Sequence, residues 1–169
     1  MVAFCAMQLT EVRDEPHAQP GDAFYMRLAL TLAADALVTG EIPIGAVVVR
    51  DGQVVGRAHN APIALQDPSA HAEVLALRDA ARWAQNYRLP GMTLYVTVEP
   101  CLMCVGALIH ARVTRVVFGC WEPKGGALGS VYQLGTDRRA NHRLQVCGGV
   151  EAEAARLLLQ QFFRARRGA

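Results

Sequence analysis

Four residues in two separate segments have the types and spacing of a metal site with a proton-transfer group. His71 and Glu73 are two positions apart in DPSAHAEVLALRDA, and Cys101 and Cys104 are three positions apart in VEPCLMCVGAL. Residues i and i+2 of a helix point about 200° apart, so His71 and Glu73 can converge only beyond a helix end. Two thiolates at i and i+3 near a helix start can face one point, where the helix dipole favours their ionised form.

One nitrogen and two sulfurs form the ligand set of a zinc ion whose fourth position stays open. Such a zinc lowers the pKa of water to about 7, so that hydroxide is available at neutral pH. Glu73 would then act first as a base toward this water and afterwards as an acid. We therefore expect one zinc ion per chain, held by His71, Cys101 and Cys104, with Glu73 as the catalytic residue.

Two other interpretations of these motifs stay open. A CxxC pair after a strand and at a helix start is also typical of thioredoxin-like redox proteins, although a redox pair has no use for His71 and Glu73. A closed structural zinc site needs a fourth protein ligand and would leave Glu73 without a role. None of the candidates for that ligand belongs to a paired motif. The candidates are Cys120, Cys147, His59 and His110.

Helices and strands alternate along the chain in a way that predicts an α/β fold of helices covering a mixed sheet. A helix is expected from Asp22, its N-cap, to Gly40, and a hairpin is expected around the turn Asp51-Gly52. A second helix, capped by Asp67 or Ser69, should run to about Asn86. The remaining expected elements are a strand at 92–98, a helix starting near Pro100, strands at 113–119 and 141–149, and a helix at 151–166.

The 169 residues suffice for a single core. Residues 1–20 show no sustained period and are expected to be a loose extension, and residues 21–169 a single domain. The apolar start MVAFCAMQL lacks a basic n-region, and no stretch approaches the roughly 18 apolar residues of a membrane span. With an odd number of cysteines, the sequence predicts a soluble cytoplasmic protein with reduced thiols or a metal.

Positive charge gathers at the C-terminal end. Residues 136–169 carry 7 basic and 3 acidic side chains, and all the basic ones are arginines. The planar fork of arginine donates two hydrogen bonds to a phosphate, which favours a nucleic-acid partner, although a solvated tail would have the same composition. The arginines concerned include Arg138, Arg139, Arg143, Arg164, Arg166 and Arg167.

HAE followed by PCLMC resembles the zinc-dependent nucleoside and nucleobase deaminases. Further segments are similar to the bacterial tRNA-specific adenosine deaminase family within them. These segments are EIPIGAVVV, NAPI, DPSAHAE, QNYRL, TLYVTVEPCLMC, RVVFG, GALGS, NHR and FFRARR. The resemblance covers about residues 22–167 and implies a three-layer α/β/α cytidine-deaminase-like fold, with a mixed five-stranded sheet covered by helices.

The resemblance implies hydrolytic deamination of the wobble adenosine in a tRNA anticodon loop to inosine, by a homodimer in which the partner helps to form the RNA site. A base must leave its stack to reach a buried metal. The implied substrate-binding residues are Asn60 at the nucleoside, Ile44 and Val98 in the pocket, Glu122 where the family commonly has aspartate, and Lys124, Phe163 and Arg164 toward RNA.

Two further functions stay open as alternatives. A deaminase of a free nucleobase or nucleotide, of the cytosine, guanine or dCMP type, would use the same metal chemistry, but the basic FFRARR end argues against it. A non-catalytic zinc module that binds RNA or a protein partner would have no need of Glu73 as a proton shuttle.

Overall fold

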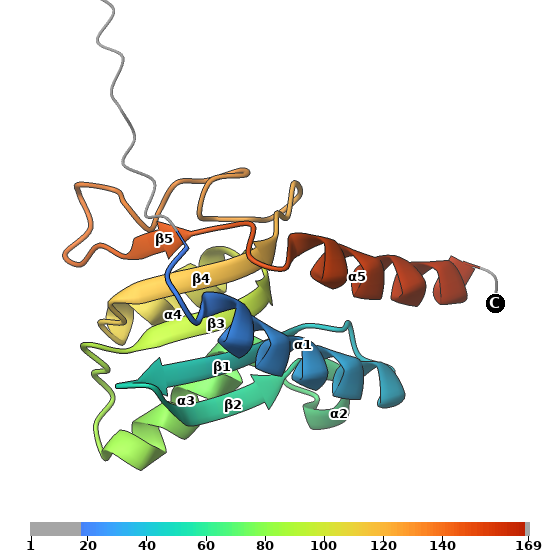
Figure 1. The fold of residues 1–169 in the computed structure, drawn as a ribbon, viewed down its shortest axis with the longest axis horizontal. Coiled ribbons are helices and arrows are strands. Elements are labelled where there is room, and N and C mark those ends of the chain that lie inside the picture. The colour runs from blue at the N-terminus through green and yellow to red at the C-terminus, as the bar shows by residue number, and fades with distance from the viewer. Residues whose placement is uncertain (1–17, 168–169) are drawn as a thin grey trace, which may run out of the picture.

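The computed structural model describes residues 18–167, which form a five-stranded mixed sheet between two layers of helices (Figure 1). Helices α1 and α5 cover one face of the sheet, and α3 and α4 cover the other. The fold class predicted from the sequence is therefore confirmed. The helices are α1 (Asp22–Val38), α2 (Pro62–Leu65), α3 (Ala72–Ala84), α4 (Leu102–His110) and α5 (Ala152–Arg167). The strands are β1 (Gly45–Arg50), β2 (Gln53–His59), β3 (Thr93–Val98), β4 (Arg115–Cys120) and β5 (Gln145–Cys147).

Residues 1–17 and 168–169 are not described, so Cys5 and most of the expected N-terminal extension lie outside the described residues. Within residues 18–167, no helix has the length and apolar character needed to cross a membrane.

The strands lie in the order β2-β1-β3-β4-β5. Strand β1 pairs antiparallel with both β2 and β3, whereas β3, β4 and β5 run parallel. The predicted hairpin is present, and both of its turn residues, Asp51 and Gly52, have positive φ (48° and 80°), as tight hairpin turns require. The parallel half brings the C-terminal ends of β3 and β4 to the same edge of the sheet.

The core lies on both faces of β3 and β4, whose residues are almost all buried. Between the sheet and the α3–α4 layer, Leu94, Phe118 and Leu108 are fully buried. On the other face α1 lies very close to the sheet, since a Cβ on Gly45 would be 2.1 Å from the backbone oxygen of Ala29. Tight packing of this kind fixes where the helices begin and end relative to the strands.

A buried ion pair joins the start of α1 to the start of β4. Both carboxylate oxygens of Asp22 accept from the guanidinium of Arg115, at 2.7 and 2.8 Å, and the Tyr95 hydroxyl donates to Asp22 at 2.9 Å. The expectation that Asp22 is the N-cap of this helix is wrong, because Gly21 occupies that position and Asp22 is the first helical residue. The carboxylate serves a contact made 93 residues away.

Helix α3 begins at Ala72, with His71 as N-cap, and not at Asp67 or Ser69 as the sequence predicted. Instead, Asp67 accepts hydrogen bonds from the backbone and the hydroxyl of Ser69 and so forms a turn before the helix. The short helix α2 was not predicted. Its first backbone N–H groups donate to the buried carboxylate of Glu41, an acceptor 22 or more residues earlier.

Candidate metal centre

Three predicted ligand atoms lie together at the edge of the sheet. Sγ of Cys101 is 3.7 Å from Sγ of Cys104 and 3.7 Å from Nδ1 of His71, and Sγ of Cys104 is 3.5 Å from the same Nδ1. Within residues 18–167, this is the one group of three or more potential ligands that could hold a metal ion. The sequence-predicted set is therefore brought together in space.

The triangle has the dimensions that zinc requires. With Zn–S of about 2.3 Å and Zn–N of about 2.0–2.1 Å, a tetrahedral ion places its sulfurs roughly 3.8 Å apart and each sulfur roughly 3.6 Å from the nitrogen. The observed separations of 3.5–3.7 Å match this geometry. His71, Cys101 and Cys104 thus form a zinc-binding site with three protein ligands.

Two helix starts position the ligands. His71 is the N-cap of α3 and Cys101 is the N-cap of α4, and both have extended backbone dihedrals, so their side chains project beyond the helix ends. Cys104 lies in the first turn of α4, three residues after Cys101. Because α4 follows β3 directly, the sheet sets the place of both thiols, and α3 brings the histidine toward them.

The two thiols titrate as a pair. The pKa of Cys101 is lowered to about 3, first because Cys104 donates a hydrogen bond to it and also because His71 faces it. The pKa of Cys104 is raised well above its usual range by that same bond and by burial. The pKa of His71 is raised, chiefly by its contact with Cys101. A thiolate is thus available at neutral pH, as metal binding requires.

Glu73 lies in the first turn of α3 and is only 4 % exposed. Its pKa is raised, because burial disfavours the charged form. Its Oε2 has no hydrogen-bond partner among the described residues. A buried carboxylate oxygen is costly to leave without a partner, so this atom is suited to bind a group that the chain does not supply.

The four candidates for a closing fourth ligand all lie elsewhere. Cys120 packs with Val98 and Ala155, and Cys147 packs in the core beneath α1. Nδ1 of His59 lies 2.8 Å from the backbone oxygen of Asn60. His110 is at the far end of α4 from Cys101 and Cys104. Within residues 18–167, no side chain closes the metal centre as a fourth ligand, which removes the support for a purely structural zinc.

Asn60 is buried next to the metal centre and has a task that the sequence did not indicate. Its Oδ1 accepts from the backbone N–H of Ala72 at 2.9 Å, which satisfies an N–H group at the start of α3. This bond fixes which end of the amide faces the helix. The NH₂ end of Asn60 is then the end that remains for other contacts.

Four further predicted residues lie around this edge of the sheet. Ile44 is half-buried and its backbone oxygen accepts from Asn60 N–H at 2.9 Å. Val98 is buried with Cys120 and Ala155, on the side of the sheet that faces α5. Glu122 and Lys124 lie in the segment after β4, where Oε1 of Glu122 accepts from the backbone of Lys124.

Phe163 and Arg164 lie on α5 in the structure. Phe163 is 45 % exposed, with its ring edge-to-face against Phe162. Arg164 is exposed and contacts Gln160 on its own helix.

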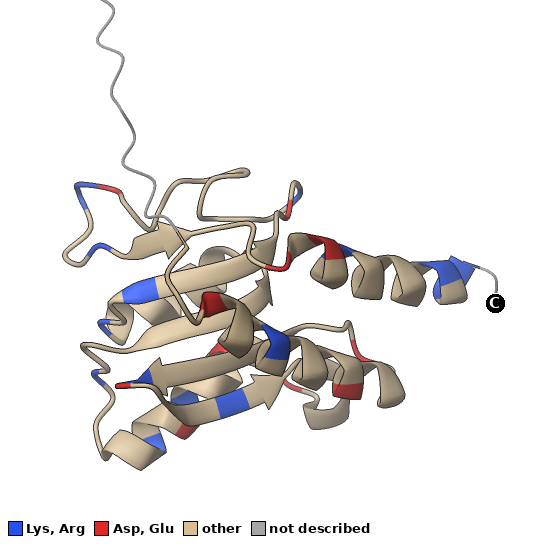
Figure 2. Ribbon diagram, in the orientation of Figure 1, with Lys and Arg blue, Asp and Glu red and all other residues tan. Residues whose placement is uncertain are grey.

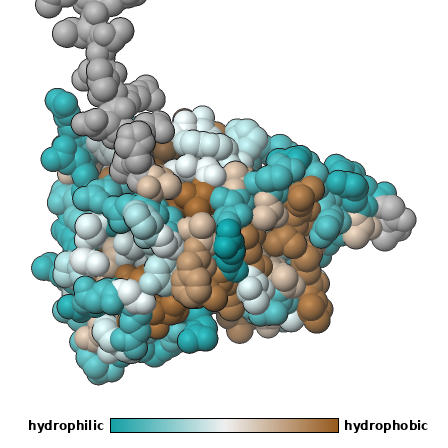
Figure 3. Space-filling model, in the orientation of Figure 1, coloured by the Kyte–Doolittle hydropathy of each residue, from teal (hydrophilic) through white to brown (hydrophobic). Residues whose placement is uncertain are grey.

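Figure 3 shows apolar side chains gathered over α1 and the neighbouring part of α5. The exposed apolar residues of these two helices include Val38, Leu157 and Phe163.

Glu99 was not singled out in the sequence. It is buried directly before Pro100, and its carboxylate accepts from the backbone N–H groups of Glu122, Leu128 and Ser130 at 2.9–3.0 Å and from the Ser130 hydroxyl. It therefore holds the segment from residue 121 to 130 against the start of α4. An acidic residue at the end of an otherwise apolar strand was the signal that could have revealed it.

Comparisons with known proteins define the class of protein first. The family model described as the cytidine and deoxycytidylate deaminase zinc-binding region matches residues 20–120. The sheet, the two helix starts and the three ligands agree with this match. The chain belongs to the cytidine and deoxycytidylate deaminase family of zinc proteins.

Curated relatives narrow the class. The chain is 49 % identical over 147 residues to the tRNA-specific adenosine deaminase of Haemophilus influenzae, covering 86 % of this chain and 85 % of that protein. It is 45 % identical over 143 residues to the tRNA-specific adenosine deaminase of Bacillus subtilis, covering 85 % and 89 %. Within the larger family, the chain belongs with the tRNA-specific adenosine deaminases.

Solved structures agree with the placement in the larger deaminase family. A structure from work on A-to-I editing by tRNA:A34 deaminases at the wobble position is similar with a TM-score of 0.78 and 40 % identity, covering 80 % of this chain and 99 % of that one. A guanine deaminase from Bacillus subtilis is similar with a TM-score of 0.57 and 37 % identity, covering 58 % and 63 %.

Proposed function

We propose that this protein is a zinc-dependent hydrolase that converts the wobble adenosine of a tRNA anticodon loop to inosine. The observation that carries the proposal is the triangle of His71, Cys101 and Cys104 beside a buried glutamate with an unpartnered oxygen. The relatives named as tRNA-specific adenosine deaminases support the choice of substrate.

The chain's own residues supply binding and proton transfer. A zinc ion held by His71, Cys101 and Cys104 would lower the pKa of water and so supply hydroxide at neutral pH. Glu73 would take one proton from that water and pass it to the adenine ring nitrogen as the remaining hydroxide adds to the amine-bearing carbon. Glu73 would then take the proton of the added hydroxyl group and pass it to the amine, so that the carbon–nitrogen bond breaks, ammonia leaves and the carbonyl group of inosine forms. The NH₂ group of Asn60 orients the nucleoside by donating a hydrogen bond to it.

RNA contact is assigned to the surface around this edge. The target base has to leave its stack to enter the site, which an unpaired loop nucleotide does at little cost. The last turn of α5 carries Arg164, Arg166 and Arg167, the blue end of that helix in Figure 2. Exposed Phe163 offers a surface on which a base can stack, and Lys124 offers a charge for a phosphate.

A deaminase of a free nucleobase is the competing candidate, and the similarity to a guanine deaminase favours it. The basic end of α5 argues against it, because a free base has no phosphate for arginines to bind. The two candidates share the metal chemistry and differ in what must reach the metal.

A substrate panel separates the two candidates. Zinc-loaded protein is incubated with an anticodon stem-loop that carries a wobble adenosine, and separately with free adenine, guanine and cytosine, and ammonia release and inosine content are measured. We expect inosine in the stem-loop and no release from the free bases. Deamination of a free base without inosine in the stem-loop would overturn the proposal.

We further propose that the protein works as a homodimer. An open groove between α3 and α4, with a volume of about 330 Å³, is almost wholly apolar and offers a face for a second copy. Its apolar lining includes Val74, Leu77, Ala81, Leu89, Ala107 and Ala111. Sedimentation at several concentrations tests this, and a single monomeric species throughout would contradict it.

We also propose a cytoplasmic location. Among residues 18–167 the four cysteines form no disulfide, which fits a reducing compartment. Fractionation of cells that express the full chain tests the proposal, and recovery outside the cytoplasmic fraction would contradict it.

A further inference from the structure

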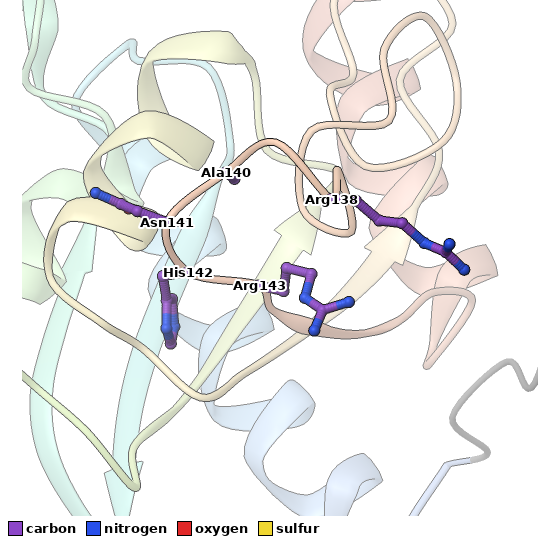
Figure 4. A pocket seen from close by; sticks show the side chains of 5 residues that line it. All are labelled: Arg138, Ala140, Asn141, His142 and Arg143. Carbon is purple, nitrogen blue, oxygen red and sulfur yellow. The ribbon is translucent and has the colours of Figure 1, made fainter.

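A second basic site lies at the end of the molecule remote from the metal centre. The segment between β4 and β5 folds around an open hollow of about 760 Å³. Figure 4 shows the side chains of Arg138 and Arg143 extending to the same side of this segment, whereas Asn141 points to the other side. The hollow is lined by Arg138, Ala140, Asn141, His142 and Arg143, none of which is acidic.

The turn at residues 138–143, which forms the hollow, is held in shape by hydrogen bonds to the residues after α4. One guanidinium nitrogen of Arg112, just after α4, donates to the backbone oxygen of Asn141 at 3.0 Å and to its Oδ1 at 2.9 Å. Nε2 of His142 lies 2.6 Å from the backbone oxygen of Val113, where a ring N–H can donate to it. Because both anchors attach to the connection between α4 and β4, this turn has a defined shape without a ligand.

The arginines of the turn differ in what they contact. Arg139 is paired with Asp137, with an N–O distance of 2.7 Å. Arg138 and Arg143 are exposed, and among residues 18–167 neither forms a hydrogen bond or an ion pair. Two guanidinium groups on one side of a fixed turn, with no carboxylate between them, form a site for an anion.

This hollow adjoins another that leads along α4. The second hollow, of about 260 Å³, shares Asn141 with the first, and it is also free of acidic side chains. Its other lining residues are Tyr87, Arg88, Gly106, Ile109, His110 and Arg112. Tyr87 is 62 % exposed, and the guanidinium of Arg88 lies 5.5 Å from the centre of its ring. The basic surface thus continues from the turn to the side of α4, where Tyr87 and His110 also line the groove that is proposed to face the second copy.

The length of α4 relates this surface to the metal centre. Cys101 and Cys104 lie at its start, and Arg112 follows its end. Nine residues at 1.5 Å each span about 14 Å. The turn at residues 138–143 therefore lies about one length of α4 from the metal centre, which is less than the length of an RNA stem of several base pairs. One RNA can thus reach both places.

We propose that the hollow at residues 138–143 binds a backbone phosphate of the RNA substrate, on the stem side of the nucleotide that enters the metal centre. The proposal rests on the proposed function, since it takes RNA as the substrate. Arg138 and Arg143 hold the phosphate oxygens, and the contact carries no sequence information. Its effect is to fix the register of the stem relative to the zinc.

The test uses the zinc-loaded full chain and an anticodon stem-loop that already carries inosine, so that binding is measured without turnover. The variants are Arg138→Gln and Arg143→Gln, and Arg139→Gln is the matched control because Asp137 already neutralises that side chain. We expect each test variant to bind about tenfold more weakly at low salt. The slope of log Kd against log salt concentration should fall by about 0.7–0.9 for each.

Four further outcomes are decisive. Arg138→Lys should restore the salt slope, because it keeps the charge. Wild-type affinity and slope in both Gln variants would overturn the proposal, as would a change of oligomeric state in place of RNA affinity, since the hollow would then be a contact between copies. If the wild-type protein bound no stem-loop at all, the proposed function itself would fail, which distinguishes the two.

Discussion

Two buried groups of ionisable side chains lie at opposite ends of β3, and they differ in whether their carboxylate oxygens have hydrogen-bond partners. At one end, Arg115 beside Thr93 meets Asp22, and both oxygens of that carboxylate are bonded. At the other end, Glu73 beside the metal ligands has an oxygen with no partner among residues 18–167. The first group stabilises the fold by pairing its charges, and the second is prepared for a ligand from outside the chain.

The largest effect on turnover is expected from substitution of Glu73, whose carboxylate has an oxygen without a partner among residues 18–167. Glu73→Gln keeps the size of the side chain and removes the base, so kcat should fall by about 10² to 10⁴ while zinc content per chain stays the same. Turnover of the stem-loop and metal analysis of the same sample measure the two quantities. Retained turnover, or loss of zinc, would count against a proton-transfer role.

Glu41→Gln is the matched control, since Glu41 is also buried with one unpartnered oxygen. Its other oxygen accepts from the backbone of Ile63 and Ala64 and not from any metal ligand. We expect its turnover to stay within about tenfold of the wild type.

Substitutions in the Asp22–Arg115 pair should lower the stability of the protein and leave its turnover unchanged. Asp22→Asn leaves Arg115 buried without a full counter-charge, so the free energy of unfolding should fall by about 3–5 kcal/mol. Urea unfolding measures the loss, and kcat per folded molecule should be unchanged. The double variant Asp22→Leu with Arg115→Met should recover much of the stability, because it removes both charges together. An equal loss in the double variant would show that packing, and not the charge pair, is responsible.

Asn60 links structure and substrate, and one substitution separates its two tasks. Asn60→Asp keeps the oxygen that accepts from Ala72 and removes the NH₂ donor. We expect zinc content to be retained and kcat/KM for the stem-loop to fall about tenfold to hundredfold. Asn60→Ala should lower the free energy of unfolding by about 1 kcal/mol as well, because the helix start also loses its acceptor. Wild-type kcat/KM in Asn60→Asp would exclude the donor role.

The smallest effect is the pH dependence of the stability that the Asp22–Arg115 pair contributes. Burial by itself raises the pKa of Asp22, but hydrogen bonds from Arg115, the Gln19 backbone and Tyr95 outweigh it, and the pKa is lowered. The stabilisation is therefore complete above the unfolded pKa of about 3.9 and is lost as the pH falls through the lower folded value. The stability difference between wild type and Asp22→Asn should be constant from about pH 5 to 7 and narrow below about pH 4. A constant difference down to pH 2 would contradict this assignment.

The sequence predicted those features whose signals are local. The hairpin at Asp51 and Gly52, the parallel strands and the metal ligands all follow from short patterns, and the structure has them. The start of α3 was predicted too early because Asp67 and Ser69 are both good caps. The acceptor for Ala72 is the side chain of Asn60, 12 residues upstream, which no local pattern reveals.

The same limit applies to Asp22 and Glu99. A cap and an ion-paired carboxylate look alike in sequence, and the partner Arg115 lies 93 residues away. The bonds of Glu99 run to residues 23 to 31 positions later. Long-range polar contacts depend on the folded topology, so local sequence patterns do not predict them.

The carboxylate of Glu99 has a consequence for how this protein can change. Three of its four bonds go to main-chain amides, so the shape of the segment from 121 to 130 depends little on which side chains it carries. The exposed side chains of Pro123 and Lys124 can be exchanged while the backbone keeps its path, whereas Trp121 packs against Phe118. Gly126 and Gly129 are less exchangeable, since a Cβ at Gly126 would lie 2.2 Å from Glu99 Oε2 and a Cβ at Gly129 would lie 2.9 Å from the Trp121 ring. Changes in substrate range are therefore expected at a few exposed side chains of this segment, while its backbone keeps the same path.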